Sequence, residues 1–188
     1  MKLNTILLLS LVLLPSYAKA SYFQLKPSDN AYQQVKQLLP LIGSWSCQSS
    51  SLQPDGNWQK TSNRSQWDWK YILNGHAIQD FWYPNESNLE APGAGTNLRT
   101  YDPVKDAWEM VWTFDKYSRF QTFNASFKDN KWVMQGEYPA SKTRPAHMAR
   151  ITFYNISNKY FDWYYESSNI GDGKNWMKVA KIACDKKP

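Results

Sequence analysis

The chain has 188 residues, a formal charge of +6 and an aromatic content of 16%, including ten Trp and twelve Tyr. Its basic residues are scattered along the sequence, which argues against a nucleic-acid partner, because a nucleic-acid-binding surface needs Lys and Arg clustered on one face. After the first twenty residues no apolar run approaches the ~18 residues of a membrane span, so we expect a soluble chain. The length fits a single domain.

The first twenty residues have the features of a signal peptide. Lys2 supplies a positive start, residues 6–14 are apolar, and Ala18-Lys19-Ala20 forms a cleavage site of small residues. We therefore expect residues 1–20 to be removed on export and residues 21–188 to form one domain, periplasmic or secreted.

A short helix is predicted over residues 27–41. Ser28 and Asp29 are typical of a helix N-cap, and Pro40 and Gly43 mark the end. Apolar residues recur between them at helical spacing, at Tyr32, Val35, Leu38 and Leu39.

From Gly43 onward, apolar residues alternate with polar ones, and turn residues recur about every ten positions. The strongest local signal is Asn74-Gly75 between two alternating runs, the preferred two-residue hairpin turn. This pattern predicts ten strands, at 43–52, 58–73, 76–83, 96–101, 107–114, 119–127, 131–138, 148–155, 159–167 and 175–184. A turn at 171–173 introduces the last one.

Ten antiparallel strands joined by short turns indicate a meander that closes on itself. An even number lets the first and last strands pair antiparallel, and closure removes both sheet edges. Cys47 and Cys184, the only two cysteines, lie in those two strands, and export permits a disulfide. We therefore predict an all-β, ten-stranded antiparallel up-and-down β-barrel with a short N-terminal helix and a Cys47–Cys184 bond. A two-sheet sandwich is the alternative, although it gives no special reason for the positions of the cysteines.

Two motifs resemble a known superfamily. Gly43-Ser44-Trp45 opens the first strand directly after the helix, as the Gly-x-Trp signature of the calycin superfamily (lipocalin-like barrels) does. The run 99–103 (Arg-Thr-Tyr-Asp-Pro), with Trp108 and Trp112 behind it, is similar to small exported bacterial calycin-like domains of unassigned function.

The resemblance implies a structural role for these residues. Gly43 would allow the helix to approach the barrel floor closely, and the Trp45 indole would plug the closed end. In lipocalins a cation from the last strand lies over this Trp; here the last predicted strand offers Lys178 and Lys181 and no Arg. The Thr-Asp-Tyr element of true lipocalins is absent, so the resemblance is to the superfamily and supplies no catalytic residues.

Sequence motifs for metal binding or catalysis are missing. His76 and His147 are the only histidines, and neither has a Cys or carboxylate at metal-ligand spacing. We expect both to be rim or hydrogen-bonded buried residues, with haem ligation by one of them as the alternative. No Gly-x-Ser-x-Gly elbow and no phosphate-binding glycine loop occur. No catalytic residue, metal site or cofactor is therefore assigned.

The alternation leaves open which strand face is interior. Glu109 alternates with small or polar residues, opposite a face that carries Trp108 and Trp112. If the more polar face lines the barrel, the groups that would orient a ligand are Arg99, Tyr101, Glu109, Arg150 and Tyr164. Ion pairs on the outer surface explain the same residues.

The function favoured by these features is an exported, monomeric binding protein for a small, largely apolar molecule held inside the barrel. The expected ligand contacts are Trp69, Trp108 and Trp112 in the lining, with Arg99 and Tyr101 as polar anchors. One alternative is a calycin-type isomerase, lyase or hydrolase that uses His76 and Glu109 as titratable groups. The other is a structural or partner-docking protein with a filled barrel.

Overall fold

The computed structural model describes residues 25–116, 119–142, 144–169 and 175–188. The predicted signal peptide and the predicted turn at 171–173 lie outside the described residues. Within the described ranges, no helix is both long and apolar enough to span a bilayer.

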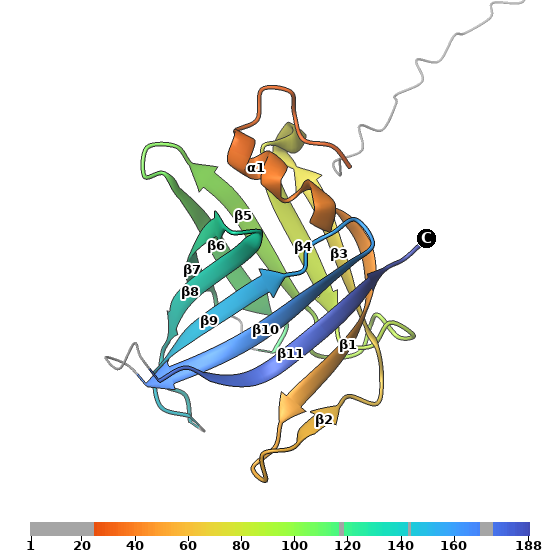
Figure 1. The fold of residues 1–188 in the computed structure, drawn as a ribbon, viewed down its shortest axis with the longest axis vertical. Coiled ribbons are helices and arrows are strands. Elements are labelled where there is room, and N and C mark those ends of the chain that lie inside the picture. The colour runs from red at the N-terminus through yellow and green to blue at the C-terminus, as the bar shows by residue number, and fades with distance from the viewer. Residues whose placement is uncertain (1–24, 117–118, 143, 170–174) are drawn as a thin grey trace, which may run out of the picture.

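The fold is a closed antiparallel β-barrel (Figure 1). Its ten strands are β1 Gly43–Leu52, β3 Ser65–Ile72, β4 Ala77–Tyr83, β5 Gly95–Asp102, β6 Ala107–Phe114, β7 Gln121–Lys128, β8 Lys131–Tyr138, β9 His147–Tyr154, β10 Tyr160–Asn169 and β11 Met177–Lys186. Each strand pairs with the next one along the ring, and β11 pairs with β1 to close it. The predicted ten-stranded up-and-down barrel is confirmed.

The closing seam carries the predicted disulfide. Cys47 of β1 lies directly opposite Cys184 of β11 in the ladder, and the two sulfur atoms are 2.03 Å apart. Both residues are buried. The bond therefore joins the first and last strands of the barrel at their shared edge.

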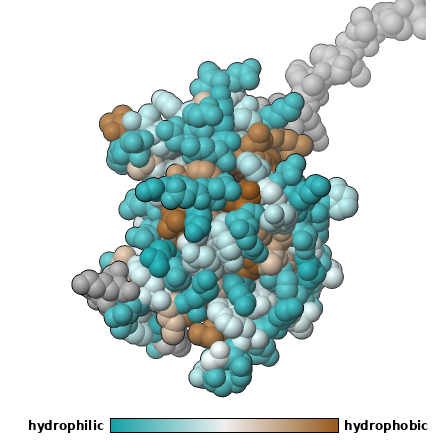
Figure 2. All heavy atoms as spheres, in the orientation of Figure 1, coloured by the Kyte–Doolittle hydropathy of each residue, from teal (hydrophilic) through white to brown (hydrophobic). Residues whose placement is uncertain are grey.

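The aromatic face of the strands points inward. On β6, Trp108 and Met110 are buried, while Glu109 between them is exposed and pairs with Lys105. Arg150 lies on the outer face of β9. Hydrophilic residues cover most of the outer face seen in Figure 2. Glu109, Arg150 and Tyr164 are thus surface residues, whereas Arg99 and Tyr101 are buried inside.

The long strand expected over 58–73 is wrong, because the chain bends at residues 61–64. The Thr61 hydroxyl donates to the Asn63 carbonyl at 2.8 Å, and the Thr61 N–H donates to the Ser49 carbonyl at 3.0 Å. The bend separates β3 from β2 (Trp58–Lys60), a short exposed strand that pairs with β1 outside the ring. Side-chain hydrogen bonds to nearby backbone compete here with the ladder.

The hairpin between β3 and β4 is confirmed, but its turn is longer than two residues. Ile72 pairs with Ala77, which leaves four residues in the loop. Residues 73–75 adopt φ values of 51°, 55° and 85°, so Leu73 shares the left-handed backbone expected only of Asn74 and Gly75. His76 completes the loop and is exposed.

The N-terminal helix is shorter than predicted. It comprises α1 (Gln33–Gln37) followed by a 3-10 turn at Leu39–Leu41. Tyr32 occupies the N-cap position, and the Ser28 hydroxyl bonds to Asn30 instead, so the predicted capping is wrong. The helix lies across one end of the barrel (Figure 1) and buries Val35 and Leu38 there.

Trp45 plugs the closed end beneath α1. Its side chain is fully buried, its indole Nε1 donates to the Leu41 carbonyl at 2.7 Å, and Phe161 packs edge-on at 4.7 Å. The Lys186 ammonium lies 4.3 Å from the centre of the Trp45 ring. A cation from the last strand therefore does cover this Trp, but it comes from beyond residue 184, where the strand was expected to end.

Gly43 is required by the same contact. Its φ is +124°, and a Cβ at this position would lie 2.8 Å from the Lys186 Cε and Nζ atoms. A side chain here would displace Lys186 from Trp45.

Candidate ligand-binding cavity

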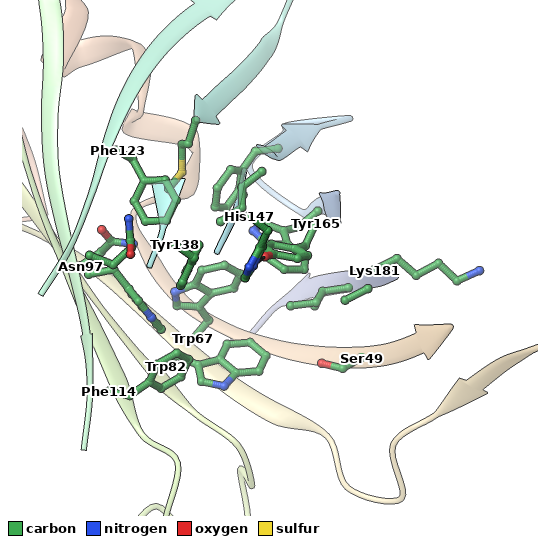
Figure 3. Close-up of a pocket in the computed structure, with 18 of the residues that line it drawn as sticks. Ser49, Trp67, Trp82, Asn97, Phe114, Phe123, Tyr138, His147, Tyr165 and Lys181 are labelled. Carbon is green, nitrogen blue, oxygen red and sulfur yellow. Dashed lines mark hydrogen bonds between the residues drawn. The ribbon is translucent and has the colours of Figure 1, made fainter. Parts of the chain in front are cut away.

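The half of the barrel opposite α1 contains a cavity of about 770 Å³ (Figure 3). Its wall is predominantly aromatic and aliphatic. The large apolar lining residues are Trp67, Trp82, Trp112, Phe114, Phe123, Met134, Ile151, Phe153, Trp163 and Ile182. The volume and the apolar lining are those of small-molecule sites, which occupy roughly 300–1,000 Å³.

The cavity is confined to one half because the other half is filled. Trp69, Tyr71 and Trp132 are fully buried between the cavity and α1, and Trp108 is nearly so. Their rings contact one another, with 6.4 Å between the centres of Trp69 and Trp132 and 5.6 Å between those of Trp108 and Trp132. This aromatic layer forms the floor below the cavity.

A buried ion pair lies at the inner end of the cavity. Arg99 of β5 and Asp80 of β4 are both fully buried, and Nη1 of Arg99 donates to Oδ2 of Asp80. Trp67 Nε1 donates to Oδ1 of the same carboxylate at 2.8 Å. The Asn97 amide is oriented so that its nitrogen donates to the Val111 carbonyl and its oxygen accepts from Nη2 of Arg99 at 3.0 Å.

Two indole rings flank the Arg99 guanidinium. Its Cζ lies 4.2 Å from the centre of the Trp69 ring and 5.0 Å from that of Trp132. Burial lowers the pKa of Arg99 well below its ordinary value, but a guanidinium starts so far above neutrality that it stays charged. Because Asp80 cancels this charge, the inner end is polar and neutral overall.

His147 and Tyr165 lie on the cavity wall near its mouth, next to Tyr138 in Figure 3. His147 Nδ1 lies 3.1 Å from the Pro145 carbonyl, so this nitrogen is the donor. Nε2 then accepts from the Tyr165 hydroxyl at 3.0 Å. Burial lowers the pKa of His147, which favours this neutral tautomer, and burial raises the pKa of Tyr165. The Tyr138 ring stacks on the imidazole at 5.2 Å.

Arg144 reaches the same wall from the loop between β8 and β9. Its Nη2 donates to the Ser167 hydroxyl at 2.7 Å, and its N–H donates to the Ser141 hydroxyl at 3.1 Å. The guanidinium also lies near Tyr165, where it opposes the rise in that residue's pKa. We call Arg144, His147, Tyr165 and Ser167 the rim cluster.

The five residues predicted as ligand contacts lie at two depths. Arg99 and Trp112 line the cavity. Trp69 and Trp108 belong to the aromatic layer below it, and the Tyr101 hydroxyl bonds to Asp106 and Gln34 beneath α1. Alternation predicts that a side chain points inward, but not how far along the barrel axis it lies.

The titratable groups of the enzyme hypothesis do not share the cavity. His76 lies in the exposed β3–β4 turn, and Glu109 is exposed on the outer surface. Most of the cavity wall was not predicted, including the polar residues His147 and Tyr165, and Arg144 in a loop. His147 lies on the same strand face as Ile151 and Phe153, and this alternation was the sequence feature that could have placed it inside the barrel. In the described parts of the chain, no group of three or more His, Cys, Asp or Glu residues could hold a metal ion.

The chain thus forms a ten-stranded antiparallel β-barrel with one helix-covered end and one hollow end. Among solved structures, the chain is similar to the S-type phycobiliprotein lyase CPES from Guillardia theta, with 10% identity, a TM-score of 0.53, and coverage of 83% of this chain and 92% of that one. It is also similar to Rv2717c from M. tuberculosis, with 10% identity, a TM-score of 0.51, and coverage of 85% and 100%. No family model and no curated protein matches the sequence. At this identity the likeness concerns the fold alone.

Proposed function

We propose that the protein is an exported binding protein that holds a small, largely apolar molecule in the barrel cavity. The observation that carries this proposal is the contrast between the two halves of the barrel. One half is packed with buried Trp and Tyr rings, whereas the other contains about 770 Å³ of space lined by the same residue types. Side chains around such a space lose packing contacts that a ligand would restore.

The few polar groups in the cavity would orient the ligand. They are the neutral Asp80–Arg99 pair at the inner end and the rim cluster near the mouth. Small-molecule sites are commonly built in this way, with an apolar wall and a few placed polar groups. Export is supported by the disulfide at the seam, because such bonds persist in oxidising compartments.

Binding is favoured over catalysis by the state of His147. Both of its ring nitrogens are engaged, one with the Pro145 carbonyl and one with the Tyr165 hydroxyl. A general base needs a free lone pair directed at its substrate. The cavity also favours ligand binding over the alternative of a structural protein with a filled barrel.

Titration with N-phenylnaphthylamine, an uncharged probe that fluoresces in apolar surroundings, tests this proposal. We expect saturable binding to the wild type. Ala180→Trp places an indole in the cavity wall and is expected to weaken binding about fivefold or more, as unrelieved overpacking of 1–3 kcal/mol implies. Ala183→Trp, on the exposed face of the same strand, is the matched control and is expected to bind normally.

Absence of saturable binding by the folded wild type would refute the proposal, as would equal binding by the two Trp variants. Native mass spectrometry of the purified protein would then show whether a molecule is retained, and its mass would identify the ligand class directly.

A further inference from the structure

The charges around the cavity have one sign. The described residues that line it include the cations Arg99, Arg119, Lys142, Arg144 and Lys181, and none of these described lining residues is an Asp or Glu. A concave, apolar site with cations at its wall raises the local concentration of anions. An apolar ligand without charge would gain nothing from this arrangement.

Two of these cations are already engaged elsewhere. Asp80 neutralises Arg99 at the inner end. The Lys181 side chain extends away from the other labelled residues in Figure 3, and its ammonium lies over the Trp58 ring at 4.3 Å, outside the barrel. The rim of the cavity therefore carries the charge that is available to a ligand.

Arg144 is the best-placed cation at the rim. Its described side-chain contacts are with the hydroxyls of Ser167 and Tyr165, which carry no negative charge. A guanidinium has five N–H donors, so these contacts leave donors for a further acceptor. The Arg144 backbone also exchanges hydrogen bonds with Ser141 of the same loop.

The neighbouring residues also suit an anion. Ser167 pairs with the fully buried Ala149 across the β9–β10 ladder, which places its hydroxyl on the inner surface. His147 adds no negative charge, and Tyr165 keeps its proton near neutrality because burial raises its pKa. An anionic group at Arg144 would therefore meet hydroxyls and a guanidinium and no repelling charge among the described residues.

We propose that the ligand is an amphipathic carboxylate, whose apolar body occupies the cavity and whose carboxylate is bound at the rim by Arg144. This inference deepens the proposed function and depends on it. A planar carboxylate matches the fork of a guanidinium, and charge-assisted hydrogen bonds of this kind are about twice as strong as neutral ones. The body would extend from the rim toward Trp67 and Phe153 at the inner end.

The test is displacement of N-phenylnaphthylamine at about pH 8 by three molecules that differ only in their head groups: dodecanoate, dodecanol and dodecyltrimethylammonium, each below its micellar concentration. Dodecanoate is expected to displace the probe at an about tenfold lower concentration than dodecanol. Hydrogen bonds to charged groups contribute about 1.5–3 kcal/mol to binding, which corresponds to roughly tenfold or more in affinity. The cationic molecule is expected to displace it most weakly.

Variants then locate the anchor. Arg144→Gln is expected to abolish the preference for dodecanoate while leaving dodecanol displacement unchanged, and Arg144→Lys to retain part of it. Arg150→Gln is the matched control, because Arg150 lies on β9, the strand that follows the Arg144 loop, and pairs there with Glu166 of β10 on the outer face of the barrel. Circular dichroism of each variant establishes that it is folded.

The outcomes separate the two proposals. If the wild type binds no N-phenylnaphthylamine, the proposed function itself fails. If the probe binds but dodecanol and dodecanoate displace it equally, the function stands and the carboxylate inference is overturned. A preference for dodecanoate that survives Arg144→Gln overturns the assignment of Arg144 as the anchor.

Discussion

Arg99→Met is expected to lower the free energy of unfolding by about 3–5 kcal/mol, because it leaves a buried carboxylate without its counter-charge. Asp80 is fully buried, and after the substitution its remaining described side-chain partner is the Trp67 indole N–H. The stacking of the guanidinium between Trp69 and Trp132 is lost as well. Met fills a similar length of space, so cavity formation contributes little to the expected loss.

The reciprocal variant, Asp80→Asn, leaves Arg99 as the uncompensated charge and is expected to cost a similar amount. The double variant, Asp80→Asn with Arg99→Met, has a neutral interior. The unfolding free energy that the double variant loses is expected to be about 2–3 kcal/mol smaller than the sum of the losses in the two single variants. This difference is the coupling free energy of a directly interacting pair. Urea unfolding followed by circular dichroism measures all three, with the m-value checked for constancy.

Arg150→Met is the control, because the side chains of Arg150 and its partner Glu166 are 28% and 12% exposed, whereas those of the Asp80–Arg99 pair are fully buried. Its cost in unfolding free energy is expected to be smaller, since the pair keeps contact with solvent. The reasoning is refuted if Arg99→Met costs no more than Arg150→Met, or if the two single costs at the buried pair simply add.

Three further predictions follow from the seam, the rim and the cavity wall. Replacing both Cys47 and Cys184 by Ser is expected to lower the unfolding free energy by about 5 kcal/mol on the loop-closure model; unchanged urea midpoints would contradict this. The folded state lowers the pKa of His147 below 6.5. The stabilisation of the fold by neutral His147 is therefore complete above about pH 6.5 and is lost as the pH falls through the folded-state pKa. His147→Gln should flatten the pH dependence of the urea midpoint, and a parallel curve would argue against it. Gly95→Ala places a Cβ 2.6 Å from the Trp112 ring, so the indole must shift, and N-phenylnaphthylamine affinity should change several-fold; unaltered affinity would show that this wall position does not shape the cavity.

Several features of the fold were predictable because they are local or depend only on counting. Alternation and turn residues define strands within a few positions of one another, and an even number of strands allows closure. The disulfide was predictable because the two cysteines lie in the first and last strands, which closure places side by side. The role of Trp45 as a plug was implied by the resemblance of Gly43-Ser44-Trp45 to the calycin signature. Element ends were less accurate, because hydrogen bonds at residues 61–64 and the extension of β11 to Lys186 depend on the neighbouring strands.

The candidate site depends on the tertiary structure in a way that no local pattern expresses. Both faces of β6 carry apolar residues, so only closure of the barrel decides that Trp108 is inside and Glu109 outside. Depth along the barrel axis follows from the stagger of all ten strands, and it separates Trp112 in the cavity from Trp108 in the packed floor.

The sequence alone therefore determined the strands, their closure and the disulfide, since each follows from alternation or from counting strands and cysteines. The three-dimensional arrangement alone decided that one half of the barrel is hollow. It also brought Asp80 to Arg99 and Arg144 to Tyr165, groups that lie 19 and 21 positions apart and meet only across curved, paired strands. Burial and the pairing of charges are properties of that closed surface, and they arise only when the ring of strands is complete.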